Sequence, residues 1–276
     1  MEVQGHLVGV CSWSLQPKDY ADLVAKVKAA GLSHLQLALG PLLKLHAEER
    51  DRAIATLKDA DLQLTATMIS YPGEDYTTIA TIKRTGGLVP DDLFESRKAL
   101  TIEAATLSRS LGCRCMSTHV GFIPPPNDAM YATVVQRLLE LTKPLADLGI
   151  DLLMETGQEP AAELLQFINN IPAKNLGVNF DPANMLLYGS GDPVEAIQTL
   201  GKHVRHVHAK DAVKSSNPGI DWGSEVPFGD GEVPHAGFMA ALRQVGYAGP
   251  IVIEREAGND RLGDVQYAID TLKALG

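Results

Sequence analysis

Short apolar runs rich in Val, Leu and Ile alternate with longer amphipathic runs from one end of the chain to the other. The short runs are typical of buried strands, and the longer runs, with apolar residues three or four apart, are typical of helices. The apolar runs predict strands at residues 6–11, 35–39, 64–69, 114–118, 150–154, 176–180, 204–207 and 250–253. The amphipathic runs predict a helix after each strand, at residues 19–30, 47–60, 93–111, 128–148, 160–169, 193–200, 235–245 and 262–275.

This alternation predicts parallel strands, because each helix returns the chain to the same end of the sheet. Eight such units in 276 residues fit the size of one closed barrel. We therefore expect an α/β protein built as a single-domain (β/α)8 TIM barrel over residues 1–276. An open, doubly wound sheet is the alternative, but no Gly-x-Gly-x-x-Gly follows the first predicted strand.

Two connections, residues 70–92 and 211–234, are much longer than the others. Both leave the carboxyl end of a predicted strand, which is the end where barrels of this kind carry their active sites. Long loops in that position are either lids over a site or ordinary surface loops.

Four successive predicted strands end in a carboxylate or an imidazole, at Glu155, Asp181, His208 and Glu254. A charge at the end of an apolar strand is costly unless it is paired or metal-bound, and converging carboxylates repel one another. Any one of these residues alone fits a surface ion pair, but the pattern over four neighbouring strands favours a divalent cation. Oxygen ligands with a single imidazole suit Mn²⁺, Mg²⁺ or Co²⁺ and admit Zn²⁺.

Two other histidines, His206 and His119, also lie at or near strand ends, and we expect them at positions different from that of His208. His208 is the expected ligand rather than His206 because it lies nearer the end of its strand. We expect His206 to pack inside the barrel or to support His208. His119 follows the fourth strand and should reach the rim, as a substrate contact or a further ligand. Cys113 and Cys115 should pack as small apolar groups, because no second cysteine pair completes a zinc site.

The composition limits the kinds of molecule that this protein is expected to bind. A net charge of -10 argues against nucleic acid, whose binding depends on clustered Lys and Arg. No apolar run reaches membrane-spanning length, and the N-terminus has no basic and apolar leader pattern. The three cysteines are an odd and sparse set that fits a reducing compartment. We therefore expect a cytoplasmic protein that binds neither membranes nor nucleic acids.

The strand-end segments resemble the xylose isomerase-like barrel superfamily, in its sugar phosphate isomerase/epimerase branch. The resemblance covers nearly the whole chain and specifies the superfamily more than the substrate. The segments that carry it are Glu155, Asp181-Pro182-Ala183-Asn184, His206-Val207-His208-Ala209-Lys210-Asp211, Gly229-Asp230-Gly231-Glu232-Val233 and Gly249-Pro250-Ile251-Val252-Ile253-Glu254-Arg255-Glu256.

The resemblance implies that Glu155, Asp181, His208 and Glu254 bind the metal, with Mn²⁺ as the first expectation. In the ketose 3-epimerases of this superfamily the two glutamates also form the acid–base pair, so Glu155 and Glu254 are the predicted catalytic residues. The implied reaction is an isomerisation or epimerisation of a small sugar or sugar-like polyol, with proton transfer through a metal-stabilised enediolate.

Three positions depart from those epimerases. Asn184 stands in place of a histidine, Ala161 in place of a glutamate and Lys214 in place of an arginine. The corresponding side chains in the relatives contact substrate hydroxyls, which argues against a free-ketose 3-epimerase.

A lyase is therefore the alternative, since relatives in this superfamily carry out β-elimination on keto-inositols or 3-keto-glycosides. The predicted substrate-binding residues for either reaction are His119, Lys210, Asp211, Asn184 and Trp13. Lys210 could instead form an ion pair with Asp211. An apurinic-site endonuclease would need more rim histidines and a basic groove, and a binding module without catalysis would not need both glutamates. Relatives in this superfamily are often dimers or tetramers, so the resemblance also allows a homo-oligomer.

Overall fold

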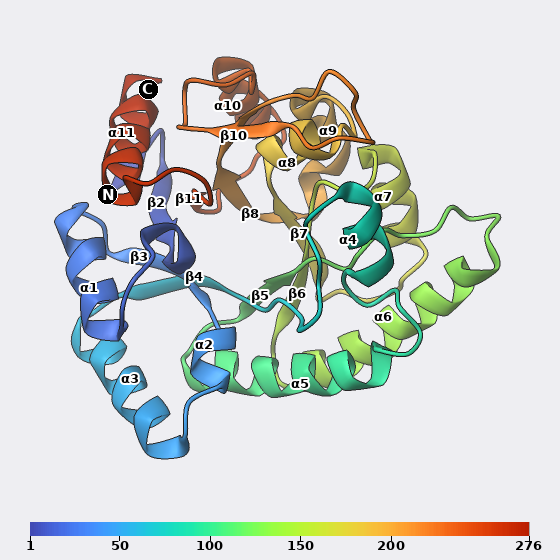
Figure 1. The fold of residues 1–276 in the computed structure, drawn as a ribbon, viewed down its shortest axis with the longest axis horizontal. Helices are drawn as coiled ribbons and strands as arrows, with labels where there is room; N and C mark the ends of the chain where they lie inside the picture. The colour runs from blue at the N-terminus through green and yellow to red at the C-terminus, as the bar shows by residue number, and fades with distance from the viewer. Residues whose placement is uncertain (276) are drawn as a thin grey trace.

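Eight parallel strands close into a barrel in the computed structural model, which describes residues 1–275 (Figure 1). β2 pairs with both β11 and β3, so the sheet formed by these eight strands closes on itself. The barrel strands are β2 (His6–Cys11), β3 (His34–Ala38), β4 (Gln63–Met68), β5 (Cys115–Thr118), β6 (Asp151–Glu155), β7 (Leu176–Phe180), β8 (Val204–Ala209) and β11 (Ile251–Ile253). The predicted (β/α)8 barrel is confirmed.

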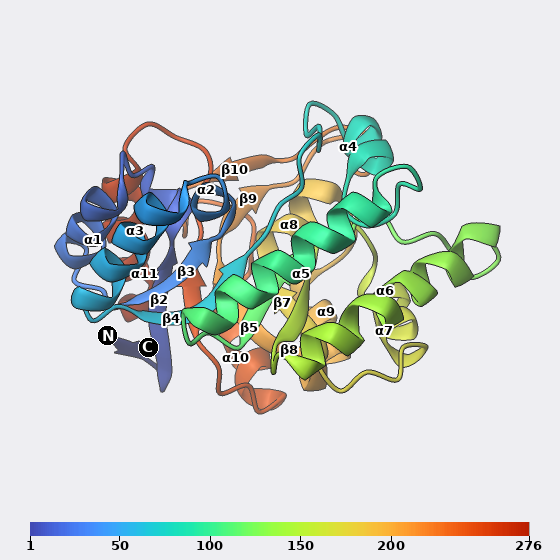
Figure 2. The same cartoon turned by 90° about the horizontal axis from the view of Figure 1, so that it is seen from below.

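One long helix follows each barrel strand, and these helices surround the barrel (Figures 1 and 2). Their apolar faces form one continuous core with the strands. Several of the helices begin at an aspartate whose side chain accepts a hydrogen bond from the first turn, as Asp19 and Asp192 do. The helices are α1 (Tyr20–Ala29), α3 (Ala47–Asp59), α5 (Phe94–Ser110), α6 (Ala129–Asp147), α7 (Ala161–Asn169), α9 (Pro193–Leu200), α10 (His235–Gln244) and α11 (Arg261–Ala274).

The two long connections contain regular structure that the sequence pattern did not predict. Residues 70–92 include α4 (Ile79–Thr85), which begins with a capping box at Thr78. Residues 211–234 include a ribbon of two antiparallel strands, β9 (Asp211–Val213) and β10 (Ser224–Val226). Figure 2 shows α4 and this ribbon on the same side of the barrel.

Within residues 1–275, five further short elements also lie outside the predicted pattern. The strand β1 extends the barrel sheet by pairing with β2 in the antiparallel sense. The others are helical segments of three to seven residues at strand ends or before a strand. The five are β1 (Glu2–Val3), η1 (Ser12–Leu15), α2 (Gly40–Leu43), α8 (Pro182–Tyr188) and η2 (Gly201–His203).

The inside of the barrel carries a buried polar layer. The fully buried His206 bonds through Nδ1 to Asn179 Oδ1 at 2.8 Å and through Nε2 to Thr65 Oγ1 at 3.1 Å. Thr65 on β4 and His206 on β8 are not on neighbouring strands, so this bond crosses the interior. His206 therefore packs inside the barrel, as the sequence predicts.

Candidate metal centre

Four side chains meet at the carboxyl end of the barrel, one from each of four neighbouring strands. Glu155 ends β6, Asp181 directly follows β7, His208 is the next-to-last residue of β8, and Glu254 directly follows β11. The strand order β11-β8-β7-β6 places them side by side. One ligand atom of each residue lies within 4.8 Å of the others, and all four are buried. The structure thus brings together the four residues predicted to bind a metal.

The distances place the histidine nitrogen at the middle of the carboxylates. His208 Nδ1 lies 3.0 Å from Glu254 Oε2, 3.3 Å from Glu155 Oε1 and 3.5 Å from Asp181 Oδ2. His208 Nδ1, Glu155 Oε2 and Asp181 Oδ2 are buried and have no hydrogen-bond partner among the described residues. Each buried polar atom left unsatisfied costs about 1–3 kcal/mol. A divalent cation would satisfy these atoms together, so the donor set fits the metal that the sequence predicts.

Asp181 is oriented by the helix that it begins. Its Oδ1 accepts hydrogen bonds from the backbone N–H groups of Ala183 and Asn184, at 2.8 and 3.1 Å, at the start of α8. Pro182 at the first helical position needs no such partner because it has no N–H group. With Oδ1 held in this way, Oδ2 faces the cluster.

Lys210 supplies a positive charge at the edge of the cluster. Its Nζ lies 2.6 Å from Glu256 Oε2, 3.0 Å from Glu254 Oε2 and 3.7 Å from Asp181 Oδ2. Burial lowers the pKa of Lys210, but the neighbouring carboxylates raise it well above its ordinary value, so the ammonium group stays charged. The alternative ion pair of Lys210 with Asp211 is wrong, because the partners are carboxylates that follow β7 and β11.

A cavity of about 510 Å³ opens beside the cluster and is lined by Lys210 and Glu254. Both tryptophans of the chain, Trp13 and Trp222, also line it. Trp13 Nε1 donates a hydrogen bond to Glu254 Oε1 at 2.8 Å, so its ring is fixed next to a predicted ligand. The cavity therefore combines aromatic walls with a charged end, the usual composition of a site for a small polar molecule.

The two long loops meet at the wall of this cavity. Trp222 from the second loop donates from Nε1 to the backbone carbonyl of Tyr76 in the first, at 3.2 Å. The Trp222 ring also packs edge-on against Tyr188, with ring centroids 4.7 Å apart. All three aromatic residues line the cavity. Both loops thus form part of the cavity wall. The sequence alone did not decide whether they are lids over a site or ordinary surface loops.

His119 and Asn184, two of the predicted substrate-binding residues, line the cavity next to Glu155. His119 Nε2 lies 3.7 Å from Glu155 Oε2, and its Nδ1 bonds to Gln158 Nε2 at 2.8 Å. Asn184 Nδ2 donates to Glu155 Oε1 at 3.4 Å. Each can therefore meet a group bound beside Glu155.

Asp211 does not face the cavity, and its predicted contact with substrate must be corrected. Its carboxylate accepts backbone N–H bonds from Gly229, Gly231 and Val233 at 2.9–3.1 Å. It also lies 2.7 Å from His235 Nε2. Because the loop and this histidine occupy both carboxylate oxygens, Asp211 anchors the second long loop.

Gln36, at the end of the second predicted strand, was a candidate for a hydrogen bond to substrate, but its Oε1 lies 2.6 Å from His208 Nε2. The sequence did not single out three further residues that line the cavity, Glu256, Tyr76 and Tyr188. The sequence could have indicated Glu256, because it lies two residues after Glu254 and an extended chain places such residues on the same face. For Tyr76 and Tyr188, on a loop and a short unpredicted helix, no sequence periodicity points to the site.

A closed (β/α)8 barrel with three carboxylates and one imidazole at the carboxyl ends of its strands is an arrangement that fits a divalent cation. The family described as xylose isomerase-like TIM barrel matches residues 24–275, and the chain belongs to this family. The predicted superfamily is therefore confirmed. Among residues 1–275, no helix has both the length and the apolar character needed to cross a membrane.

Solved structures with the same fold include a xylose isomerase domain protein from Planctomyces limnophilus. It is 35% identical, with a TM-score of 0.86, over 91% of this chain and 90% of that one. A D-psicose 3-epimerase from Clostridium cellulolyticum, solved with D-tagatose, has a TM-score of 0.73 at 17% identity, over 98% of this chain and 99% of that one.

Among curated proteins, an inosose dehydratase from Lacticaseibacillus casei is 24% identical over 133 residues, which is 44% of each chain. The match to curated relatives spans at most 61% of their own length. The similar proteins thus include both an epimerase and a dehydratase.

Proposed function

We propose that this protein is a divalent-metal-dependent isomerase or epimerase that acts on a sugar or a sugar-like polyol. The observation that carries the proposal is the buried cluster of Glu155, Asp181, His208 and Glu254, with ligand atoms within 4.8 Å of one another. Three carboxylates and one imidazole suit Mn²⁺ first, and Mg²⁺, Co²⁺ or Zn²⁺ as alternatives. The similarity to a D-psicose 3-epimerase supports a sugar as the substrate.

Glu155 and Glu254 are the residues to which we assign proton transfer. A cation held by the cluster would polarise a substrate carbonyl and the neighbouring hydroxyl, which acidifies the C–H bond between them. The two glutamates come from β6 and from the end of β11, with β7 and β8 between them, so they approach the substrate from different directions. One takes the proton from carbon and the other returns a proton, which gives an epimer or an isomer.

The cavity walls suit a polyol. The rings of Trp13, Tyr188 and Trp222 offer apolar faces against which the C–H faces of a sugar pack. His119 and Asn184 offer polar groups on the Glu155 side, within reach of hydroxyls. These contacts orient the substrate, while the loops that carry Tyr76 and Trp222 limit the access of water.

The position of Lys210 favours a lyase as the second candidate. Its ammonium group lines the cavity 3.0 Å from Glu254 Oε2, so a proton donor lies beside a proposed base. If Glu254 removes a proton next to a carbonyl, Lys210 can protonate an oxygen that leaves from the neighbouring carbon. That reaction would be β-elimination from a keto-inositol or a 3-keto-glycoside, and the similarity to an inosose dehydratase supports it.

Proton exchange separates the two candidates. Metal-loaded protein would be incubated in D₂O with ketoses, inososes and 3-keto-glycosides, and the products followed by NMR. Deuterium uptake beside the carbonyl with all carbon–oxygen bonds retained is the result expected for an isomerase or epimerase. Deuterium uptake with release of water or an aglycone would show that the protein is a lyase instead. If no compound exchanged deuterium, both proposed functions would be overturned.

A further inference from the structure

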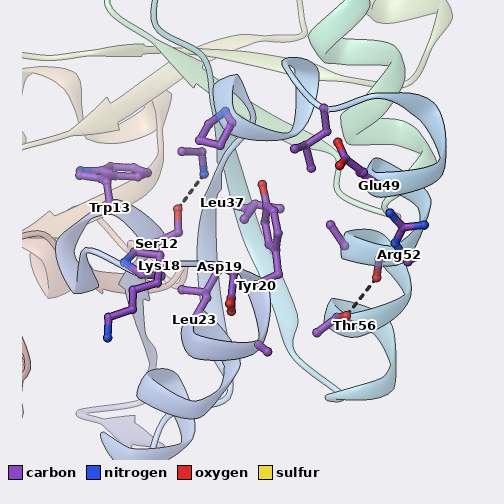
Figure 3. Close-up of a pocket in the computed structure, with 16 residues that line it drawn as sticks. Ser12, Trp13, Lys18, Asp19, Tyr20, Leu23, Leu37, Glu49, Arg52 and Thr56 are labelled. Atoms are coloured by element: carbon purple, nitrogen blue, oxygen red, sulfur yellow. Dashed lines mark hydrogen bonds between the residues drawn. The ribbon is translucent and has the colours of Figure 1, made fainter.

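A second cavity, of about 620 Å³, lies next to the metal cavity, between α1, α3 and the end of β3. The two cavities share three wall residues, Trp13, Ala38 and Pro41. Figure 3 shows Trp13 and Lys18 on one side of the second cavity and Arg52 and Thr56 on the other. The metal cavity alone is large enough to hold a sugar, so a sugar would leave the second cavity unfilled.

The boundary between the two cavities is held in place by hydrogen bonds. Ser12 Oγ accepts a bond from the backbone N–H of Ala38 at 2.9 Å, which joins η1 to the end of β3. Trp13, the next residue, is fixed through Nε1 to Glu254 at 2.8 Å. Trp13 thus contacts a predicted metal ligand and lines both cavities, so the two cavities adjoin at this residue.

The wall of the second cavity is mainly apolar, with Leu23, Leu37, Leu45 and Ala53 contributing to it. Its distinctive polar group is the Tyr20 hydroxyl, which is buried and has no hydrogen-bond partner among the described residues. Burial raises the pKa of Tyr20 to about 12, so the hydroxyl keeps its proton at neutral pH and is available as a donor. A ligand that is apolar but carries an acceptor would satisfy this atom.

We propose that the second cavity binds an apolar, flat substituent of the substrate, such as an aryl group with an oxygen acceptor, while the sugar part lies in the metal cavity. This inference rests on the proposed function, because it assigns the substrate class of that site: a sugar or polyol that carries an aromatic group. The two cavities adjoin at Trp13, Ala38 and Pro41, and this adjacency is the observation that favours a substituent over a separate molecule.

The test compares two unreactive probes, methyl and phenyl β-D-glucoside, bound to the Mn²⁺-loaded protein and followed by NMR titration. We expect phenyl glucoside to bind at least about tenfold more tightly, since burying a ring adds more than about 1.4 kcal/mol. Ala21→Trp, a substitution at an exposed wall residue on α1, should remove this gain and leave methyl glucoside binding unchanged. Ala55→Trp, at an exposed position of α3 away from the wall, is the matched control.

A second variant tests the hydroxyl. Tyr20→Phe should lower the affinity for 4-acetylphenyl β-D-glucoside about three- to tenfold and leave the affinity for phenyl glucoside unchanged, because only the first offers an acceptor. Melting temperatures of all variants show that they are folded.

Three results would overturn the inference. Equal affinity for the methyl and phenyl probes, including no binding of either, leaves the second cavity without a role. A phenyl gain that survives Ala21→Trp places the ring elsewhere. Phenol that competes with neither glucoside but binds at the same wall residues would mean a separate ligand. Failure of the proposed function is distinguished from all three, because deuterium exchange is measured with small ketoses that carry no substituent.

Discussion

Gln36 Oε1 lies 2.6 Å from His208 Nε2, and both side chains are fully buried. An amide oxygen only accepts hydrogen bonds, so Nε2 carries the proton and the Nδ1 lone pair faces the carboxylates. Gln36 is itself oriented, because its Nε2 donates to Ser117 Oγ at 2.8 Å. The imidazole is therefore held in the form that binds a cation, by residues on β3 and β5 across the barrel.

Removing this acceptor should weaken metal binding. We expect Gln36→Leu to lower the affinity for Mn²⁺ about 10–100-fold, the usual effect of losing a partner of a ligand histidine. Gln36→Glu keeps an oxygen at that position and should retain most of the affinity. Competition with a fluorescent chelator measures both constants. Wild-type affinity in Gln36→Leu would contradict the role assigned to Gln36.

The two predicted catalytic glutamates can be tested without unfolding the barrel. Glu155→Gln and Glu254→Gln conserve size, and each should abolish turnover while the circular dichroism spectrum stays that of the wild type. Glu163→Gln, on α7 outside the cluster, is the control and should retain full activity. Normal activity in either cluster variant would exclude the two-glutamate mechanism.

Metal binding should also appear as folding stability. A cation that binds the folded chain and not the unfolded one adds about 2.7 kcal/mol at a concentration of 100 times its dissociation constant. We therefore expect Mn²⁺ to raise the melting temperature and a chelator to lower it. Asp181→Asn should lose this response, whereas Glu256→Gln should keep it, since Glu256 is not among the four clustered residues. An unchanged melting temperature in the wild type with and without Mn²⁺ would count against a site in the cluster.

The barrel and the meeting of the four candidate ligands at one of its ends could be predicted from the sequence, because both depend on local patterns. Apolar runs set the strands, and the carboxyl ends of parallel strands meet at one end of a barrel, which brings Glu155 and Glu254 together without any knowledge of packing. The contact between Gln36 and His208 could not be found in this way. It joins residues that lie far apart in the chain, and it depends on which side chains meet across the interior.

The error over Asp211 has a simple physical cause. Adjacent residues of an extended chain point to opposite faces, so Lys210 and Asp211 cannot both face the cavity. His206, His208 and Lys210 share the inner face of β8 and its extension, and Asp211 turns to the loop. The short helix α8 and the β9–β10 ribbon escaped the pattern because elements of so few residues give no usable periodicity.

The corrected role of Asp211 predicts a stability effect. Asp211→Asn replaces one of the acceptor oxygens by an NH₂ group, which then faces backbone N–H donors or His235. We expect a loss of about 1–3 kcal/mol of unfolding free energy, measured by urea denaturation. Asp221→Asn, at an exposed position in the same loop, should cost much less. An equal effect of the two substitutions would mean that Asp211 does not anchor the loop.

Glu159 is the residue for which we expect the clearest pH dependence of stability. It lies in the loop after β6, where its Oε1 accepts the backbone N–H of Ile123 at 2.7 Å. Burial raises its pKa to about 8, from an ordinary value of 4.5, and the negative charge of Glu163 acts in the same direction. The folded chain therefore holds this carboxyl protonated at neutral pH, while the unfolded chain ionises it.

A carboxyl whose pKa is raised by folding favours the folded state fully below its unfolded pKa, and this contribution is lost as the pH rises through the folded pKa. Glu159→Gln cannot ionise, so it should match the wild type near pH 4 and exceed its unfolding free energy near pH 9, by about 2–4 kcal/mol. Urea denaturation at a series of pH values measures the difference, with Glu103→Gln, at an exposed position of α5, as the control that should follow the wild-type curve closely. A difference between Glu159→Gln and the wild type that stays constant from pH 4 to pH 9 would show that the Glu159 carboxyl titrates at its ordinary pKa in the folded chain.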